Sequence, residues 1–197
     1  MADSLAAMDS QTSPETPEAD LLRLAQKGGR DALEQLIMRY ERRILALALR
    51  LTGSLPDAQD AAQETFVRLH LRIREIAVER GVGAWLCAVA VNACRDVGRR
   101  RRRSRLVPMP PAVEVADRFP DPERRVSARQ SEACLRAALA SLPEKERAAL
   151  LLREMEGLST AEVARALGSS EVTVRSQISN ARKKLRGFFE RRGEVLP

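Results

Sequence analysis

The chain is 197 residues long and carries a net charge of +7, a length that allows one or two small domains and a charge that favours a polyanionic partner. Three cysteines without CxxC spacing and a single histidine argue against a zinc site or a disulfide framework, so Cys87, Cys94 and Cys134 are expected to be small buried side chains. No apolar run approaches the ~20 residues that span a bilayer and no signal peptide is visible, so we expect a cytoplasmic protein without membrane insertion.

Charge is segregated along the chain. Residues 1–20 hold five acids and no base, residues 99–125 hold nine Arg against four acids, and residues 171–192 hold seven Lys or Arg against two acids. Residues 1–19 are rich in Ser, Pro, Thr and acids, so they are predicted to form a disordered acidic lead-in.

A helical pattern begins near Ala19. Its first long stretch keeps a 3.6-residue period over five turns, with inward positions at Leu33, Leu36, Ile37, Tyr40, Ile44, Leu47, Ala48 and Leu51. Thr52–Pro56 breaks this pattern, and Asp57 is expected to open a second helix. The inward residues of the second helix are Ala62, Phe66, Leu69, Ile73 and Ile76. After a loop at Glu79–Gly83, a third helix is predicted from Ala84 to about Arg100, with Leu86, Val89, Ala90, Ala93 and Val97 inward.

A basic and proline-rich segment separates two helical regions. It opens with the run Arg99–Arg105 (RRRRRSR) and contains Pro108, Pro110, Pro111, Pro120 and Pro122. This proline density excludes a helix, so a flexible linker is predicted over 104–125. Helical pattern resumes near Val126, and Pro143 suits the first position of a later helix. Because no strand alternation appears, the predicted fold class is all-α, with domains at 20–103 and 126–192 and a tail at 193–197.

The residues from Leu158 to Arg186 predict a helix-turn-helix. Ser159 and Glu162 form an S-x-x-E capping box that opens one helix, and Gly168 supplies a tight turn. Ser169 or Ser170 then caps a second helix, whose apolar stripe is Val174, Ile178, Ala181 and Leu185. Its opposite face carries Ser176, Ser179, Asn180 and Lys183, flanked by Arg175 and Arg182. This cationic, amide-bearing face suits the major groove of DNA, although an ordinary helical hairpin with a solvated face is the alternative.

Two further faces are candidates for function. The second helix carries Asp57, Asp60 and Glu64 around the apolar Val67, with Gln63 at the edge; this combination suits either a docking surface for a basic partner or a solvated acidic face. The third helix places Trp85, Asn92, Arg95, Asp96 and Arg99 on one flank. An indole that stacks, an amide and several guanidinium groups fit nucleic acid, whereas a core position for Trp85 and a solvated basic run at Arg99–Arg103 are the alternatives.

Three segments together resemble a known family. Residues 31–70 (DALEQLIMRYERRILALALRLTGSLPDAQDAAQETFVRLH) and 83–102 (GAWLCAVAVNACRDVGRRRR) are similar to region 2 of bacterial sigma factors of the extracytoplasmic-function (ECF) group. Residues 141–185, which begin SLPEKER, are similar to region 4. The resemblance covers about residues 20–190, with both regions in order and DAxDxxQExF and SLPxxxR as its markers.

The resemblance implies a transcription initiation factor that binds core RNA polymerase, reads the −35 and −10 promoter elements and assists DNA melting. It implies docking on the β′ clamp helices and the β subunit, and an anti-sigma factor is a candidate third partner. Residues implied in core-polymerase binding are Asp57, Asp60, Gln63, Glu64, Phe66 and Val67. Those implied at the −10 element are Trp85, Asn92, Arg95, Asp96, Arg99 and Arg100, with Asn92 capturing a flipped base. Those implied at the −35 element are Arg175, Ser176, Ser179, Asn180, Arg182 and Lys183.

Two departures from the family pattern are visible. Asn180 stands where an Arg is usual, which exchanges a preference for guanine, or for phosphate, for one towards adenine. Gln177 likewise departs from the usual Arg. Trp85 is the only aromatic residue on the third helix, so melting would rely on one flipped base and phosphate contacts.

Two other classes of function stay open at this level. A dimeric DNA-binding regulator would use the same helix-turn-helix, with residues 20–100 for oligomerisation or sensing. A DNA-modifying enzyme would need a catalytic Ser or Tyr, but Tyr40 lies on a core stripe. The chain has no glycine-rich phosphate loop and no nucleophile beside a base, so we expect neither catalysis, nor a cofactor, nor a metal site.

Overall fold

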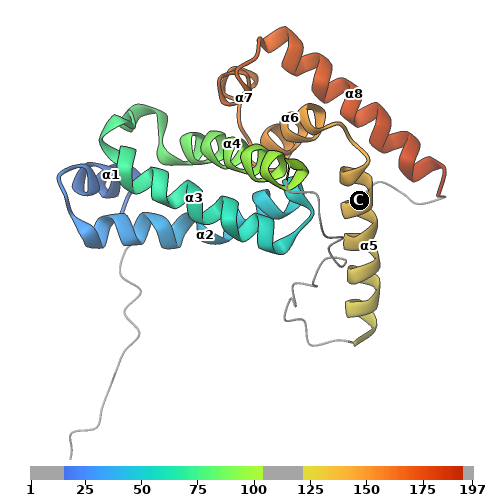
Figure 1. The fold of residues 1–197 in the computed structure, drawn as a ribbon, viewed down its shortest axis with the longest axis horizontal. Coiled ribbons are helices and arrows are strands. Elements are labelled where there is room, and N and C mark those ends of the chain that lie inside the picture. The colour runs from blue at the N-terminus through green and yellow to red at the C-terminus, as the bar shows by residue number, and fades with distance from the viewer. Residues whose placement is uncertain (1–15, 104–121, 193–197) are drawn as a thin grey trace, which may run out of the picture.

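The computed structural model describes residues 16–103 and 122–192, and this part of the chain is helical without strands. The expected lead-in up to residue 15, most of the expected linker and the tail at 193–197 lie outside the described residues. The all-α prediction is confirmed, with helices grouped in two domains (Figure 1).

The first domain contains four helices. They are α1 (Glu18–Gln26), α2 (Arg30–Thr52), α3 (Leu55–Arg72) and α4 (Val82–Arg103), with 3-10 turns at Ile73–Glu75 and Val78–Arg80. The 3.6-residue apolar periods bring α2, α3 and α4 together around a shared core, in which Leu36, Ile44, Leu69 and Leu86 are completely buried. The predicted inward stripes are therefore confirmed at their centres.

Helix α1 begins at Glu18, one residue before the expected start of the helical pattern near Ala19 and just inside the predicted lead-in 1–19. Glu18 anchors it, because one carboxylate oxygen accepts a hydrogen bond from the Tyr40 hydroxyl at 2.5 Å and the other accepts one from the backbone N–H of Val82 at 2.7 Å. Gly81, at φ +68°, permits this approach, since a Cβ there would lie 3.1 Å from the Glu18 carboxylate. Burial and the bond to Glu18 raise the pKa of Tyr40 well above its ordinary value. One acidic side chain thus joins α1, α2 and the start of α4.

Two boundaries in the first domain differ from the sequence expectation. Helix α3 begins two residues before Asp57, because Ser54 is its N-cap and Pro56 is tolerated in the first turn. Helix α4 begins at Val82 and continues to Arg103, so most of the arginine run extends the helix rather than the linker.

The second domain contains α5 (Pro122–Ala140), α6 (Glu144–Glu154), α7 (Thr160–Leu167) and α8 (Glu171–Glu190). The helix-turn-helix prediction is confirmed for α7 and α8. The capping box forms, with Glu162 N–H donating to Ser159 Oγ at 3.3 Å and Ser159 N–H donating to the Glu162 carboxylate at 2.8 Å. Gly168 adopts φ +60°, and Ser170, not Ser169, caps α8.

Prolines account for two corrections in this domain. Helix α5 begins at Pro122, within the linker predicted over 104–125, because the first turn of a helix accepts proline. Pro143 is the N-cap of α6 and so lies one residue before the first helical position. Apart from these shifts, the helices follow the expected pattern.

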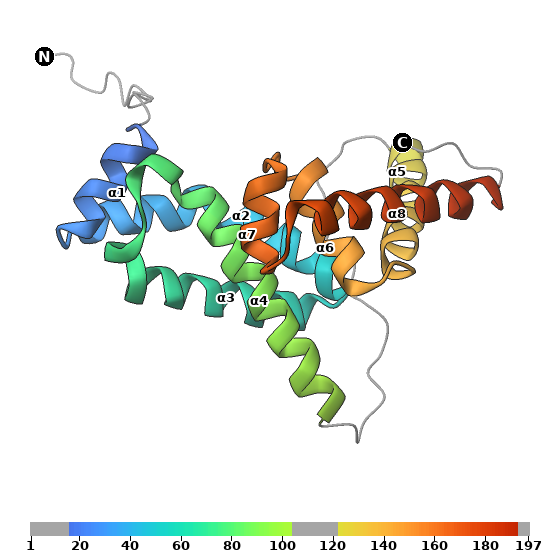
Figure 2. The same cartoon turned by 90° about the horizontal axis from the view of Figure 1, so that it is seen from above.

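The two domains pack against each other, which the prediction of two domains joined only by a tether did not include. Helix α7 lies on α4, and α6 approaches α2 (Figures 1 and 2). The reason is that α4 has two buried faces. Leu86 and Ala90 face the core of the first domain, whereas Cys87, Val91 and Cys94, also buried, face the second domain.

Removing the Glu18 anchor should destabilise the first domain. Glu18→Ala leaves the Tyr40 hydroxyl and the Val82 N–H without their acceptor, so we expect the free energy of unfolding in urea to fall by about 1–3 kcal/mol. Asp20→Ala is the matched control, because Asp20 makes only an exposed ion pair with Arg23, and its effect should stay within ~0.5 kcal/mol. Equal effects of the two substitutions would contradict the anchor.

Candidate nucleic-acid interface

The exposed face of α8 carries the full set of residues that the sequence pattern assigned to it. Burial of Val174, Ile178, Ala181 and Leu185 turns the opposite side of the helix to solvent. All six predicted side chains are exposed there: Arg175, Ser176, Ser179, Asn180, Arg182 and Lys183. The face offers hydrogen-bond donors, an amide and positive charge along one side of a helix, as major-groove recognition requires.

The two residues that depart from the family pattern, Asn180 and Gln177, lie in different environments in the structure. Asn180 lies on the exposed face, free to meet a base edge. Gln177 is half-buried, and its buried side-chain oxygen has no hydrogen-bond donor within the described part of the chain. Helix geometry explains the difference, because position 177 lies beside the core stripe and position 180 lies opposite it. Of these two residues, only Asn180 lies where it could contact a base.

A basic groove runs beside this face. It is lined by Arg153, Thr160, Arg175, Ile178, Ser179, Arg182, Lys183 and Arg186, with a volume of about 490 Å³. Arg153 from α6 also donates to the Leu158 carbonyl at 2.8 Å, so it braces the turn that precedes α7. Thr160 is the first residue of α7, where the helix dipole adds to the attraction of an anion.

Three residues of this groove were missed by the sequence reasoning, namely Arg153, Thr160 and Arg186. Arg186 lies one turn beyond the predicted set and could have been included by continuing the helical period. Arg153 and Thr160 belong to other helices, and only the folding of α6 and α7 against α8 brings them here.

The predicted cluster on α4 is divided by the tertiary structure. Asn92, Arg99 and Arg100 are exposed, as a nucleic-acid contact requires. Arg95 instead turns towards the second domain, where it pairs with Glu144 of α6 at 3.2 Å. Asp96 accepts from Arg99 at 2.6 Å and lies 3.8 Å from Arg68 of α3, so it orients neighbouring guanidinium groups.

Trp85 is half-buried, packing against the core of its own domain and facing the helix-turn-helix. Together with Ala84 and Ala88 it lines a cavity of about 230 Å³, whose other side is Glu162, Arg165 and Ala166 of α7. In this arrangement α7 therefore lies against the α4 surface that carries the indole.

The acidic face of α3 is exposed over Asp60, Gln63 and Val67. Glu64 is half-buried and pairs with Arg68 at 3.0 Å, while Phe66 packs inward against the core. Asp57 points elsewhere, to Arg101 of α4 at 2.9 Å. A shallow groove of about 220 Å³ joins this face to α4, and its far wall is Ala93, Asp96, Val97 and Arg100.

The contact between the domains is centred on Glu156, between α6 and α7. Its side chain is only 6% exposed and forms an ion pair with Arg43 of α2, whose guanidinium also donates to the Glu156 carbonyl at 2.9 Å. The Cys87 thiol lies 3.6 Å from the same carboxylate. Burial, and next the charge of Glu156, raise the pKa of Cys87 to about 12; burial also raises that of Cys94 to about 12.

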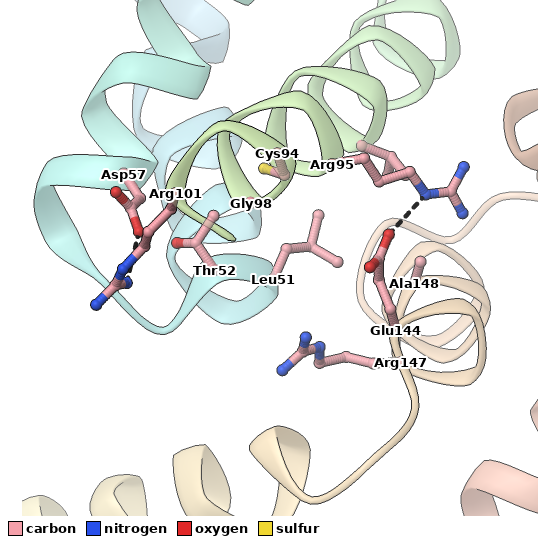
Figure 3. Close-up of a pocket in the computed structure, with 11 residues that line it drawn as sticks. Leu51, Thr52, Asp57, Cys94, Arg95, Gly98, Arg101, Glu144, Arg147 and Ala148 are labelled. Carbon is pink, nitrogen blue, oxygen red and sulfur yellow. Dashed lines mark hydrogen bonds and ion pairs between the residues drawn. The ribbon is translucent and has the colours of Figure 1, made fainter. Parts of the chain in front are cut away.

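Beside this contact lies a cavity of about 400 Å³ between α2, α4 and α6 (Figure 3). Figure 3 shows the Arg95–Glu144 pair on one side and the Arg101–Asp57 pair on the other. Arg147 also lines it, and burial lowers the pKa of this guanidinium from its ordinary value. Its buried Nε has no acceptor within the described residues. The contact thus combines buried apolar residues of α4 with ion pairs and one unsatisfied guanidinium nitrogen, a mixed composition typical of interfaces between domains.

Among the described helices, none combines the length and the apolarity that a membrane-spanning segment needs.

Comparisons with known proteins agree with the two-domain division. The family described as Sigma-70 region 2 matches residues 36–105, and Sigma-70 region 4 matches residues 132–185. The ECF RNA polymerase sigma factor SigM of Mycobacterium tuberculosis is 33% identical over 171 residues, which cover 87% of this chain and 84% of SigM. The RNA polymerase sigma-H factor of Pseudomonas aeruginosa is 32% identical over 187 residues, which cover 86% of this chain and 93% of the sigma-H factor.

Solved structures show the same fold. CnrH, solved in complex with the cytosolic domain of CnrY, is 27% identical, with a TM-score of 0.65 over 88% of this chain and 97% of that one. The sigma factor RpoE of Bartonella quintana, solved with the anti-sigma factor NepR, has a similar fold at 21% identity, with a TM-score of 0.62 over 80% and 96% of the two chains.

The contact between the domains can be tested through its thiols. Arg43→Glu places a second negative charge beside Glu156, so we expect the domains to separate and expose Cys87 and Cys94. In a Cys134→Ser background, alkylation at pH 8 should accelerate about tenfold or more, because both thiols lose the burial that suppresses thiolate formation.

Arg42→Glu is the matched control, since it makes the same charge change at a neighbouring exposed residue. It should leave the alkylation rate unchanged, and circular dichroism should show equal helix content in both variants. A wild-type rate in Arg43→Glu, or the same acceleration in Arg42→Glu, would argue against the contact.

Proposed function

This chain belongs to the extracytoplasmic-function group of bacterial sigma factors, and on that premise we propose that three of its surfaces each bind a different target during initiation. As a sigma factor it directs RNA polymerase to specific promoters and is needed for transcription to start there. The observation that supports this proposal is the presence of three separate polar faces, on α3, α4 and α8, each exposed by the burial of an opposite apolar stripe.

Helix α8 is assigned to the −35 element. Arg175, Ser176, Ser179 and Asn180 would face base edges, and Arg182 and Lys183 would meet phosphates together with Arg153 in the basic groove. Arg175 is paired with Glu171 at 2.9 Å and Arg182 with Glu154 at 2.5 Å. Both pairs are exposed, so a base edge at Arg175 and a phosphate at Arg182 can replace these carboxylates at little cost.

Helix α4 is assigned to the −10 element. The exposed amide of Asn92 suits the Watson–Crick edge of a base that has been flipped out of the duplex, and Arg99 and Arg100 lie along the same helix for the adjoining phosphates. Trp85 becomes available as a stacking surface only when α7 moves away. Arg95 joins this face when its pair with Glu144 is released.

Helix α3 is assigned to core polymerase. Asp60, Gln63 and Val67 supply an apolar centre with acidic edges, which suits the basic β′ clamp helices. Glu64 contributes at the rim, and Phe66 supports the face from the core side. Asp57 joins this face only if it leaves Arg101. The polymerase would supply the chemistry, so the chain acts as a binding factor in the cytoplasm where polymerase works.

Reading both promoter elements requires the two domains to separate. The elements are named for positions about 25 base pairs apart, which is ~85 Å of B-DNA. In the structure α4 and α8 both contact α7, a helix of eight residues and about 12 Å. The 18 residues between Arg103 and Pro122 allow a reach of up to roughly 60 Å. We infer that polymerase docking exchanges the contact between domains for contacts with polymerase and DNA, while the linker keeps the effective concentration of the second domain high.

A protein regulator is a further proposed partner. CnrH, whose fold this chain shares, was solved in complex with the cytosolic domain of CnrY. A protein of that kind could hold this chain in a closed arrangement by adding to the contact between the domains.

The direct test of function is reconstituted transcription. Core RNA polymerase with this chain should initiate specifically from a promoter on which core alone is silent; a DNA-binding regulator would give no such initiation. Asn92→Ala removes the amide that meets the flipped base, so open-complex formation should fall roughly tenfold to a hundredfold, while core binding on gel filtration stays unchanged.

Gln35→Ala serves as the matched control, because it deletes an exposed amide on α2, a helix to which no face is assigned. Equal activities of Asn92→Ala and Gln35→Ala would remove Asn92 from the −10 site.

Asn180 should set one position of the −35 element. Asn pairs with adenine N6 and N7 whereas Arg pairs with guanine O6 and N7, so Asn180→Arg should move the preference at one base pair from adenine to guanine, by about tenfold to a hundredfold. Selection of bound sequences from a promoter library measures this change. The −10 part of the same profile is the internal control and should not move; an unchanged −35 profile would refute the role of Asn180.

A further inference from the structure

Val172, the second residue of α8, stands out in the first turn of the recognition helix. Its side chain is 72% exposed. The polar side chains around it are engaged, because Ser170 Oγ accepts from the Thr173 N–H at 3.2 Å and bonds the Thr173 hydroxyl at 2.8 Å. Glu171 pairs with Arg175 at 2.9 Å. The cap and the ion pair therefore hold this turn in place while the valine projects into solvent.

Val172 lies on the same stripe of α8 as the residues assigned to DNA. It precedes Arg175 by three positions and Ser176 by four, and it precedes Ser179 and Asn180 by seven and eight. These spacings place side chains on one face of an α-helix. The other side of α8 is occupied by the buried stripe that includes Val174 and so cannot carry the recognition. Val172 is thus the apolar, N-terminal member of an otherwise polar face.

A single exposed apolar residue is ordinary on a protein surface, so exposure alone does not assign a role. Position is the second observation, because the N-terminal residues of a recognition helix are those that reach base edges in the major groove. Side-chain stiffness is the third. Valine is β-branched and has one strongly preferred χ1 rotamer in a helix, so its two methyl groups are presented in a fixed direction.

The major groove offers one apolar group that such a side chain can recognise. Thymine carries a C5 methyl group there, whereas adenine, guanine and cytosine present hydrogen-bond donors and acceptors. We propose that Val172 recognises the methyl group of a thymine in the −35 element and so is a specificity-determining residue of this chain. The inference rests on the proposed assignment of α8 to that element.

The geometry limits where this thymine lies. Eight residues separate Val172 from Asn180, which is about 12 Å along a helix and corresponds to no more than about four base pairs of B-DNA. The affected thymine should therefore fall within about four base pairs of the base under Asn180. Burial of one methyl group corresponds to an effect of about fourfold in binding.

Deoxyuridine provides the direct test, because it removes only the methyl group. Holoenzyme formed from core polymerase and the full chain is measured on promoter templates in which each thymine of the −35 element is replaced in turn. For the wild type, one replacement should weaken binding about fourfold. Val172→Ala should weaken binding to the unmodified template by a similar factor and be insensitive to that same replacement. Met38→Ala is the matched control, since Met38 is 73% exposed on α2, and it should keep the wild-type response.

Each other outcome overturns the inference. Tolerance of every replacement by the wild type shows that no methyl group is recognised. A loss in Val172→Ala that is the same on the thymine and the deoxyuridine templates shows that Val172 does not contact the methyl group. Asn180→Arg separates this inference from its premise: if its selected −35 profile also fails to change, the assignment of α8 falls; if only the Val172 result is negative, that assignment stands.

Discussion

Glu156 carries a charge into the first domain and is almost completely removed from water there. An isolated carboxylate in such a place would cost several kcal/mol, so the closed arrangement depends on Arg43, which supplies both an ion pair and a hydrogen bond to the backbone. This interaction fixes the turn between α6 and α7 on the surface of α2 and α4. The positions of α7 over Trp85 and of Glu144 beside Arg95 follow from it. An ion pair of this kind is specific in geometry, and separating the domains would return Glu156 to water, so the carboxylate need not be left buried without a partner.

Charges serve two purposes in this molecule. On α8 the basic groups are exposed and their carboxylate partners are exposed too, so their pairs contribute little to stability and remain exchangeable for phosphates. Along the contact between the domains each ion pair has one partner that is largely removed from solvent, Glu156 or Arg95, and Arg147 has no acceptor for its buried Nε within the described residues. The α8 surface proposed for the −35 element is thus exposed before binding, whereas Arg95 and Trp85, on the α4 surface proposed for the −10 element, must first be released from the second domain. Assembly with polymerase would make both surfaces available at once.

Helical caps and apolar periods made the local structure predictable. Ser159, Glu162 and Gly168 specified the helix-turn-helix, because capping and a positive φ are determined by residues close in the chain. The exposure of the six candidate recognition residues on α8 was likewise predictable, since a core stripe defines the opposite face. The sequence prediction missed features that depend on contacts between residues far apart in the chain. The hydrogen bonds of Glu18 to Tyr40 and Val82, which join α1 to α2 and α4, could not be indicated by any local pattern.

The sequence by itself therefore determined the helices, the two domains and the chemistry offered by each exposed face. Only the tertiary structure decided which members of each face are available together. It turned Arg95 and Asp57 towards partners on other helices, drew Gln177 inward and brought Arg153 and Thr160 to the recognition helix. The physical reason is that helical periodicity fixes the direction of a side chain about its own axis. What that side chain meets depends on a second helix, placed by burial of apolar surface and by paired charges far apart in the chain.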